Sequence, residues 1–474
     1  MSDSRSYSLS KYTKKIERQT KTIFFLATLV LSFFLVYVLR DESFTSTQDY
    51  TLFLLFMAIG LWITEAIPPF AVGILIIGFL VFSMGSNPDI DVTQYVQTWS
   101  DGVIWLFLGG FFLAEGMRKT QLDESLLKFI LPKLGGNSKN VLLGLMMVTA
   151  ALSMLMSNTA TTSMILASIA PLILTLGKDS PLIKALIIGV PAAASIGGMG
   201  TIIGSAPNAI AVGALEGIGI RISFIEWMII GMPAALLLVY LFYKLLVKKY
   251  QLKTQQISLD FLETEVVPLT QEDKIKKNIV LVVLVGTLTL WLTSQWTGIP
   301  VAVVSGVPIV LLTMLGIIDS EDVRRLPWDT LMLVAGGLSL GLAIKEQGIA
   351  EYFVQSINHF ELNYYVMIVI FGYVSVVLSN FMSNTAATTI LVPVGISLVS
   401  IIPGANVAFL PVVIGLSASC ALLLPVSTPP NAVAFSMGIV GQKEFFPGGL
   451  FIGLLGPLIL ILYTILSFSL FNFG

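Results

Sequence analysis

Long apolar segments without a charged side chain limit the possible folds of this chain more than any other feature. The runs 23–39, 278–317 and 445–474 contain no Asp, Glu, Lys or Arg. A helix of about 20 such residues crosses the hydrocarbon core of a bilayer, which is about 30 Å thick. Only 11% of the 474 residues are charged, against about 25% in soluble domains. We therefore expect an all-α polytopic membrane protein that is surrounded by the lipid bilayer.

Two basic clusters predict the orientation of the chain. One precedes the first apolar run and the other surrounds a polar linker at mid-chain. Cytoplasmic segments are enriched in Lys and Arg, so both clusters and the N-terminus are expected in the cytoplasm, with an even number of spans between them. The first run has no small-residue cleavage site, so we expect a retained helix in the cell (inner) membrane. The basic residues are Arg5, Lys11, Lys14, Lys15, Arg18 and Lys21, then Lys244, Lys248, Lys249, Lys253, Lys274, Lys276 and Lys277.

An internal duplication organises the rest of the chain. Three landmarks of the first half recur in the second half, in the same order and at a nearly constant separation. Three polar or glycine-rich landmarks in the same order are unlikely to arise by chance, so we expect two copies of one structural unit. The landmarks are Ser157-Asn158-Thr159 with Ser383-Asn384-Thr385, Gly109-Gly110 with Gly336-Gly337, and the Pro-Asn loops at Asn208 and Asn431.

Each copy contains five expected crossings, which is an odd number, so the two copies have opposite orientations in the membrane. With the first helix this gives eleven transmembrane helices, two re-entrant hairpins with the tripeptides at their tips, and two broken helices. Inverted repeats with broken helices are typical of secondary transporters. The expected elements of the first half are helices at 23–40, 48–66, 69–84, 101–118 and 225–246, an amphipathic piece at 121–133, a hairpin at 140–175 and a broken helix at 182–222. Those of the second half are helices at 275–296, 299–317, 328–345 and 445–472, an amphipathic piece at 348–360, a hairpin at 362–401 and a broken helix at 407–440.

Four polar interruptions of apolar segments are expected to converge on one binding site. They are the tips at 153–159 and 379–385 and the breaks at 200–208 and 424–431. Their hydroxyl, carboxamide and free carbonyl oxygens suit a hard cation such as Na⁺. A helix start at each tip also favours an anion, because of free N–H groups and the positive end of the helix dipole. Each tip has two serines four residues apart, on one helix face.

These four segments contain no Arg, Lys or His. A dianion without a positive charge nearby is unfavourable inside a membrane. Co-bound cations would supply that charge, so we expect anion binding and cation binding to be coupled. The chain has no H-E-x-x-H motif and one histidine, which disfavours an intramembrane metalloenzyme. We expect no cofactor and no nucleic-acid partner. Cys420 is the single cysteine of the sequence, so it has no disulfide partner in the chain. A channel is a weaker alternative to a carrier.

With these motifs the chain resembles the divalent anion:sodium symporter (DASS) family, which includes the INDY-type bacterial dicarboxylate carriers. The resemblance rests on the two Ser-Asn-Thr tips, the two Pro-Asn breaks and the two hairpins, and it covers nearly the whole chain. It implies a homodimer with an elevator mechanism, in which a transport domain carries the site across the membrane past a scaffold domain. It also implies that the two amphipathic pieces lie flat and connect the two domains.

The resemblance further implies which residues form the site. One sodium ion would bind Ser153, Ser157, Asn158 and carbonyls near Gly204. A second would bind Ser379, Ser383, Asn384 and carbonyls near Val426 to Thr428. The carboxylates of the substrate would meet Ser157, Asn158, Thr159, Ser383, Asn384, Thr385, Thr428 and Pro429.

The implied division of the chain alternates between scaffold and transport parts. It comprises a cytoplasmic basic tail (1–22), scaffold helices (23–84), the first-repeat transport part (85–222), scaffold helices with a cytoplasmic linker at 247–274 (225–317), the second-repeat part (326–440) and the last scaffold helix (445–474). Both tripeptides are intact, which favours C4-dicarboxylates such as succinate, malate and fumarate, with Na⁺-coupled symport. A sodium-independent dicarboxylate exchanger and a carrier of citrate or sulfate remain open alternatives.

Overall fold

The structure of the protein, a computed structural model, describes residues 2–257, 270–349, 352, 363–400 and 402–471. Within these ranges the chain is helical, and strand-like pairing is limited to one bridge between Asn137 and Gln256. Nine of the described helices are long and apolar enough to cross a membrane, or up to ten if one bent pair counts as a span. The expected all-α membrane fold is confirmed, and the number of eleven spans stays a prediction.

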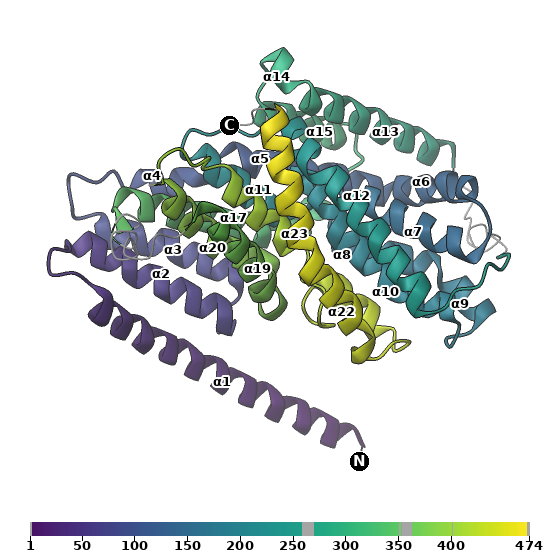
Figure 1. Cartoon of the computed structure of the whole chain (residues 1–474), viewed down its shortest axis with the longest axis horizontal. Helices are drawn as coiled ribbons and strands as arrows, with labels where there is room; N and C mark the ends of the chain where they lie inside the picture. The colour runs from purple at the N-terminus through teal and green to yellow at the C-terminus, as the bar shows by residue number, and fades with distance from the viewer. Residues whose placement is uncertain (1, 258–269, 350–351, 353–362, 401, 472–474) are drawn as a thin grey trace. The chain divides into compact units, whose positions relative to one another are not determined.

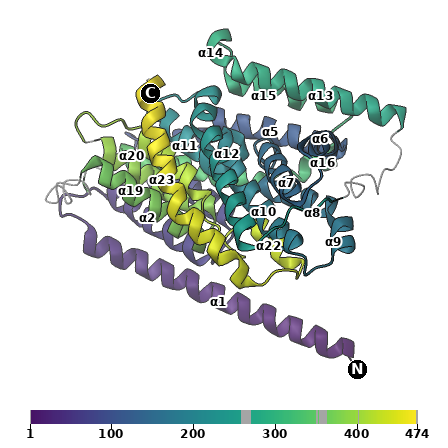
Figure 2. The ribbon, with the colours of Figure 1, turned by 45° about the vertical axis from the view of Figure 1, so that its right-hand side comes forward.

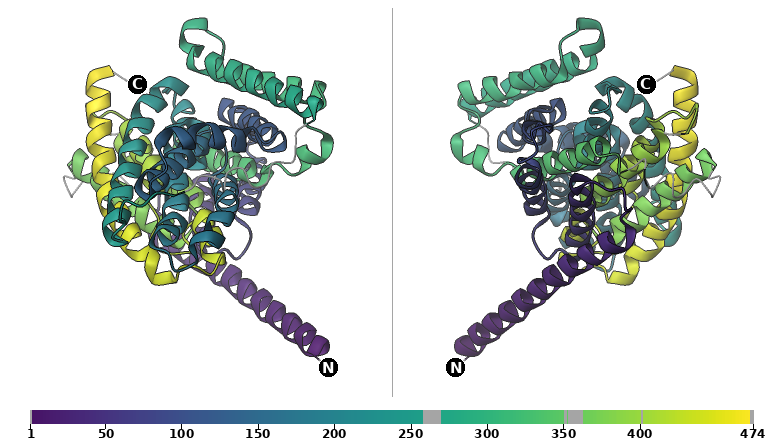
Figure 3. Two further views of the ribbon diagram at one scale, coloured as in Figure 1. Left: turned by 90° about the vertical axis from the view of Figure 1, so that its right-hand side faces the viewer. Right: turned by 90° about the vertical axis from the view of Figure 1, so that its left-hand side faces the viewer.

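The chain forms two compact units, each built from both halves of the duplication. The first unit comprises Met1–Trp99 and Asp329–Glu361, and the second comprises Ser100–Trp328 and Leu362–Gly474. In the first unit α1 is one unbroken helix (Figure 3), which begins well before its apolar part. The helices of this unit are α1 (Ser2–Leu39), α2 (Ser46–Thr64), α3 (Pro69–Met84), α4 (Thr93–Gln97) and α17 (Trp328–Glu346).

Glycine allows α3 and α17 to approach each other closely in the first unit. A Cβ at Gly336 would lie 2.2 Å from Gly73 Cα, and a Cβ at Gly73 would lie 2.5 Å from Met332 O. Small residues permit such contacts between membrane helices. The second unit has a matching contact, because a Cβ at Gly109, the counterpart of Gly336, would lie 2.7 Å from Ser305 Cβ. The duplicated glycines therefore mark two equivalent helix crossings.

The second unit contains both predicted hairpins and both broken helices (Figure 1). Its elements in the first half are α5 (Gly102–Lys119), α6 (Leu122–Ile130), η2 (Leu131–Leu134), α7 (Ser138–Ser153), α8 (Asn158–Ser168), α9 (Ala170–Leu176), α10 (Pro181–Gly197), η3 (Gly198–Gly200), η4 (Ile202–Gly204), α11 (Ala206–Glu216) and α12 (Phe224–Lys249). In the second half they are α13 (Gln271–Leu292), α14 (Ser294–Thr297), α15 (Val301–Met314), α16 (Ser320–Arg324), α19 (Tyr364–Phe381), α20 (Asn384–Ser400), α21 (Phe409–Ala418), α22 (Pro429–Ser436), η7 (Gln442–Glu444) and α23 (Phe445–Phe471).

Each predicted hairpin is a pair of helices that pack against each other. The chain turns between α7 and α8 in the first hairpin and between α19 and α20 in the second. The first hairpin continues into α9, which is bent by 44° relative to α8. The helical hairpins lie where the sequence placed them, and their re-entry into a membrane stays a prediction.

The two broken helices each pack on the hairpin of the opposite repeat. α22 packs on α8 and α10 (Figure 2), and α11 packs on α20 and α21. The second arrangement is close, because a Cβ at Gly415 of α21 would lie 3.1 Å from Pro207 O of α11. The two halves of the duplication therefore interlock within the second unit.

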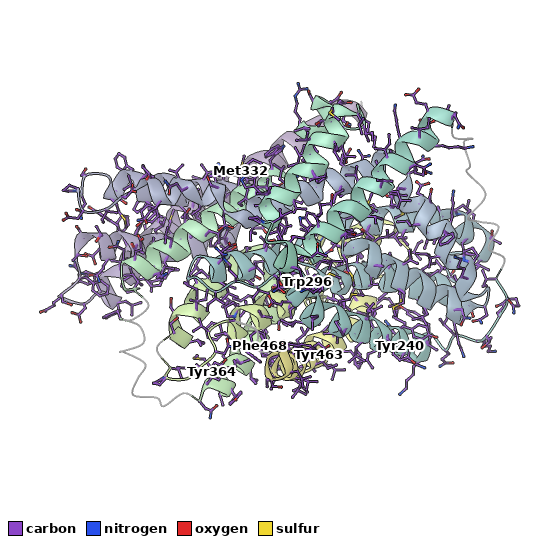
Figure 4. All side chains as sticks on the ribbon, turned by 90° about the horizontal axis from the view of Figure 1, so that it is seen from above. Tyr240, Trp296, Met332, Tyr364, Tyr463 and Phe468 are labelled. Atoms are coloured by element: carbon purple, nitrogen blue, oxygen red, sulfur yellow. The ribbon has the colours of Figure 1, made fainter. Side chains whose placement is uncertain are left out.

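Aromatic side chains join the outer helices of the second repeat. The ring of Phe409 on α21 lies 6.4 Å from that of Tyr364 on α19 and 5.5 Å from that of Phe468 on α23, measured between centroids. Figure 4 labels Tyr364 and Phe468 in this region. Tyr373 adds a hydrogen bond from its hydroxyl to Leu454 O at 2.7 Å. These contacts fix the first arm of the second hairpin against α23.

The predicted amphipathic pieces have different outcomes. The first is α6 followed by η2, which buries Leu122 and Leu127 and exposes Phe129. The loop that follows η2 is hydrogen-bonded to the linker that follows α12. Ser138 N donates to Gln255 O at 2.8 Å, and Ile257 N donates to Gly136 O. The second piece, 348–360, lies almost wholly outside the described residues.

Candidate functional site

The first tip is bonded to the broken helix of its own repeat. Ser157 caps α8, and its Oγ accepts a hydrogen bond from Ala160 N at 3.1 Å. Ser153 is fully buried and donates from Oγ to Ala194 O at 2.8 Å. One terminal atom of the Asn158 carboxamide lies 2.5 Å from Ser153 Oγ, and it is best assigned as the nitrogen.

That same carboxamide atom also lies 3.2 Å from Ala194 O and 3.2 Å from Gly204 O. Three oxygen atoms, from Ser153, Ala194 and Gly204, therefore converge on a single point. In this structure a partly positive N–H group of Asn158 occupies that point.

The first break is shaped by Thr201 and Asn208. The Thr201 hydroxyl donates to Met154 O and accepts from Gly204 N at 3.0 Å. Asn208 Nδ2 donates to Gly198 O and to Thr201 O, each at 2.8 Å. A Cβ at Gly204 would lie 2.5 Å from Gly198 O, so only glycine fits beside these carbonyls. The break is thus an ordered loop, and its Gly204 O faces Asn158 of the tip.

The second tip leaves two buried oxygens without a partner. Ser383 repeats the role of Ser157, because its Oγ accepts from Ala386 N at 3.1 Å. Ser379 is fully buried, yet its Oγ has no hydrogen-bond partner among the described residues, and neither has Asn384 Oδ1. Buried polar atoms are nearly always hydrogen-bonded. These two oxygens are therefore available to a ligand.

The second break repeats the first with different residues. Asn431 Nδ2 donates to Leu424 O at 3.1 Å, as Asn208 does in the first break, and Thr428 caps α22. The Thr428 side chain is buried, while the Val426 side chain is 78% exposed. Pro429 is exposed at the first position of α22. Of the predicted contributors here, Val426 offers its backbone carbonyl rather than a buried side chain.

All predicted site residues lie in the second unit, and most lie at a tip or a break of the expected kind. Thr159 and Thr385 are half-buried in the first turns of α8 and α20. The structure joins Ser153, Asn158 and Gly204 directly. The two repeats meet through α22 on α8 and α11 on α20. That the two tripeptides face each other across the membrane midplane stays a prediction.

Three side chains at the site were missed from the sequence. Thr201 bonds the first tip to its break, and Asn380 and Ser427 do so in the second repeat. Each is next to or near a residue that the duplication singled out. Their role depends on which backbone groups the fold brings close, and residue spacing alone does not show that.

Two threonines after the second tripeptide bind their own helix instead. Thr388 Oγ1 donates to Asn384 O at 2.9 Å and Thr389 Oγ1 donates to Thr385 O at 2.8 Å. Such bonds to the carbonyl one turn earlier are common for Ser and Thr in helices. The protons of these two hydroxyls are therefore used within α20.

The four interruptions contain no ionisable residue, and several charged side chains of the unit form ion pairs elsewhere. Lys119 Nζ lies 3.0 Å from an Asp319 carboxylate oxygen and also bonds Asp322. The pKa of Asp319 is lowered to about 2, mainly by the hydrogen bond that its carboxylate accepts from Lys119. Lys249 pairs with Glu444 at 2.7 Å. The candidate site therefore holds neutral oxygen atoms and helix starts, with no acid or base for catalysis.

One short motif of hydrolases occurs elsewhere in the chain without the required geometry. Residues 337–341 fit the pattern G-x-S-x-G. In hydrolases that serine lies exposed on a strand-to-helix turn. Ser339 is instead fully buried within α17, where its Oγ lies 2.8 Å from Tyr95 O and 2.9 Å from Ala335 O. This serine is a structural residue.

Matched hairpins, matched helix breaks and many membrane-spanning helices define a polytopic secondary transporter. The sequence model of one transporter family, described as "Sodium:sulfate symporter transmembrane region", matches residues 19–471. The chain therefore belongs to this family, and the predicted resemblance to divalent anion:sodium symporters is confirmed. The family consists of membrane transporters, not enzymes.

Curated relatives include transporters of staphylococci. The chain is 29% identical over 434 residues to the sodium-dependent dicarboxylate transporter SdcS of Staphylococcus saprophyticus, covering 85% of this chain and 82% of SdcS. It is also 29% identical over 433 residues to SdcS of Staphylococcus aureus strain USA300, with the same coverage. The match extends over most of both proteins.

Two solved structures share the fold at low sequence identity. MtrF of Neisseria gonorrhoeae has a TM-score of 0.58 at 12% identity, covering 86% of this chain and 96% of MtrF. The YdaH transporter of Alcanivorax borkumensis has a TM-score of 0.58 at 14% identity, covering 86% of this chain and 99% of YdaH. At these identities the similarity concerns the fold alone.

Proposed function

We propose that the protein is a Na⁺-coupled symporter of C4-dicarboxylates such as succinate, malate and fumarate. It works in the cytoplasmic membrane with its N-terminus in the cytoplasm. The observation that carries the proposal is the pair of matched oxygen clusters, one in each repeat, at helix starts that lack any ionisable side chain. Both curated relatives named above are described as sodium-dependent dicarboxylate transporters.

Sodium ions fit the oxygen clusters. In the first repeat the convergence point of Ser153 Oγ, Ala194 O and Gly204 O holds the Asn158 N–H group, which takes the place of a cation. A bound Na⁺ at this point would let the carboxamide turn, so that Asn158 Oδ1 becomes a ligand. In the second repeat Ser379 Oγ and Asn384 Oδ1 have no hydrogen-bond partner within the described part of the chain.

The dicarboxylate fits the two helix starts. α8 and α20 begin at the two tripeptides, and the N-terminus of a helix attracts an anion through free N–H groups and the helix dipole. A molecule with one carboxylate at each end matches two such starts. Side chains of Ser157, Asn158 and Thr159 would bind one end, and Ser383, Asn384 and Thr385 the other. Thr428 and Pro429 would complete the pocket.

Coupling follows from electrostatics. Without Arg, Lys or His at the site, the two negative charges of the substrate are balanced only by the bound cations. Each cation lowers the cost of holding the dianion in a low-dielectric region. Substrate and Na⁺ therefore bind together and cross together.

The moving part comprises the hairpins and broken helices, within 85–222 and 326–440. The remaining helices form the scaffold of a homodimer. Alternating access by an elevator movement of this part agrees with the inverted repeats.

Uptake of radiolabelled succinate into proteoliposomes tests the proposal. An inward Na⁺ gradient should drive accumulation, while K⁺ or choline in place of Na⁺ should reduce it to the level of empty liposomes. Accumulation that depends on internal succinate and not on Na⁺ would identify the exchanger alternative. Stronger competition by citrate or sulfate than by malate would identify a different substrate class.

A further inference from the structure

The second repeat contains a buried polar pair that the first repeat lacks. Asn380 directly follows the first serine of its tip, where the first repeat has Met154. Ser427 lies four residues before the asparagine of its break, where the first repeat has Gly204. A buried pair of polar side chains at these two positions therefore occurs in the second repeat only.

Asn380 and Ser427 form a closed hydrogen-bond network. Asn380 Oδ1 accepts from Leu423 N at 2.9 Å and from Ser427 Oγ at 3.0 Å. Ser427 Oγ in turn accepts from Leu424 N at 3.0 Å, and Asn380 Nδ2 donates to Val376 O at 2.8 Å. Both side chains are buried, with 7% and 6% exposure. The break is therefore hydrogen-bonded to the first arm of the hairpin.

This network leaves the neighbouring oxygens free. Ser379 Oγ and Asn384 Oδ1 are buried and have no partner among the described residues. In the first repeat the corresponding Ser153 and Asn158 bind each other and the carbonyl oxygens of Ala194 and Gly204. In the second repeat, Asn380 and Ser427 make the hydrogen bonds between tip and break. In the first repeat, Ser153 and Asn158 bond to each other instead.

We infer that Asn380 and Ser427 are positioning residues that preform the cation cluster of the second repeat. They hold the backbone of the break against the first arm of the hairpin, and their side chains are not ligands themselves. This inference rests on the proposed function, since it assigns Na⁺ to that cluster. A preformed site loses less free energy to reorganisation on binding, so the affinity for Na⁺ depends on this pair.

Thermal unfolding of the purified protein in NaCl and in choline chloride measures Na⁺ binding without transport, because a ligand that binds the folded state stabilises it. Ser427→Ala and Asn380→Leu should each raise the Na⁺ concentration that gives the same rise in melting temperature about fivefold, the effect of one lost hydrogen bond of about 1 kcal/mol. Ser427→Thr keeps the hydroxyl and should stay close to the wild type. The double variant should add little to either single change, because both remove one network.

Ser375→Ala is the matched control. Ser375 is fully buried one turn earlier on the same arm, and its Oγ donates to Ile414 O at 2.9 Å. Its removal should lower the melting temperature and leave the Na⁺ dependence unchanged. If Ser427→Ala behaves like Ser375→Ala while the wild type responds to Na⁺, the pair is merely structural and the inference is wrong. If the wild type shows no stabilisation by Na⁺, the proposed function fails, and the inference fails with it.

Discussion

Asn158 and Asn384 occupy the same place in the two repeats but have different partners. The Asn158 carboxamide contacts the Ser153 hydroxyl and two carbonyl oxygens, whereas Asn384 Oδ1 is buried and has no partner among the residues that the structure describes. The duplicated tripeptide predicted both positions. It could not predict the difference, because that depends on Asn380 and Ser427, which have no equivalents in the first repeat.

Asn158→Ala and Asn384→Ala should each reduce Na⁺-driven succinate uptake at least about tenfold, since a contact to a charged ligand contributes about 1.5–3 kcal/mol. Uptake into proteoliposomes with equal amounts of folded protein measures the loss. Ser400→Ala is a suitable control, because Ser400 Oγ only binds Ile396 O at 2.7 Å near the far end of α20. Wild-type uptake in either asparagine variant would remove that residue from the site.

Asp123 predicts a pH dependence of stability. It lies in the amphipathic helix α6 with 3% exposure, and burial raises its pKa to about 6 from the ordinary 3.8. The folded protein therefore binds this proton more tightly than the unfolded chain does. The resulting stabilisation is complete below about pH 3.8 and is lost as the pH rises through 6.

Asp123→Asn removes this titration. Relative to the wild type, the variant should gain stability as the pH rises from 4 to 7, by about 3 kcal/mol at most. Melting temperatures of both proteins at several pH values across this range measure the gain. A difference between the two proteins that stays constant with pH would contradict the assignment of the raised pKa to Asp123.

At the scale of elements, the sequence predicted helices best where apolar runs are interrupted by recognisable residues. α3 spans Pro69–Met84, as expected, because Pro69 suits the first turn of a helix. The tips were found because the duplicated Ser-Asn-Thr tripeptides interrupt apolar segments. The pairing of the linker with Gly136 and Ser138 was not predictable, since it joins segments more than a hundred residues apart without a motif of its own.

Two glycines of α3 test the close helix contact. Gly73→Ala should destabilise the protein by about 1–3 kcal/mol, the usual range for overpacking, because its Cβ would lie 2.5 Å from Met332 O. Gly78→Ala is the matched control on the same helix, since no atom lies within 4 Å of that Cβ position. Thermal unfolding in detergent compares the two variants. Equal stability of both would show that α3 and α17 are not in close contact.

For the whole molecule, the duplication predicted two similar halves in opposite orientation. The structure adds that each half packs on the other, through α22 on α8 and α11 on α20. The repeat pattern could not show this, because a duplicated sequence is equally compatible with two separate bundles.

The opposite orientation of the repeats predicts the sidedness of two exposed loops. Asp179 follows the first hairpin and Pro403 follows the second. In a Cys420→Ala background, the single cysteines Asp179→Cys and Pro403→Cys should react with an impermeant maleimide from opposite sides of the membrane. Asp179→Cys should react only from the cytoplasmic side, which inside-out vesicles expose. Labelling of both cysteines from one side would contradict the inverted repeat.

The central claim is that neutral oxygens hold a dianion only together with cations. The affinity of the purified protein for succinate in NaCl, compared with choline chloride at equal ionic strength, tests this claim most directly. Coupling between two binding sites commonly amounts to about 1–3 kcal/mol, so succinate should bind about 5- to 150-fold more tightly in Na⁺. Equal affinity for succinate in the two salts would contradict the account.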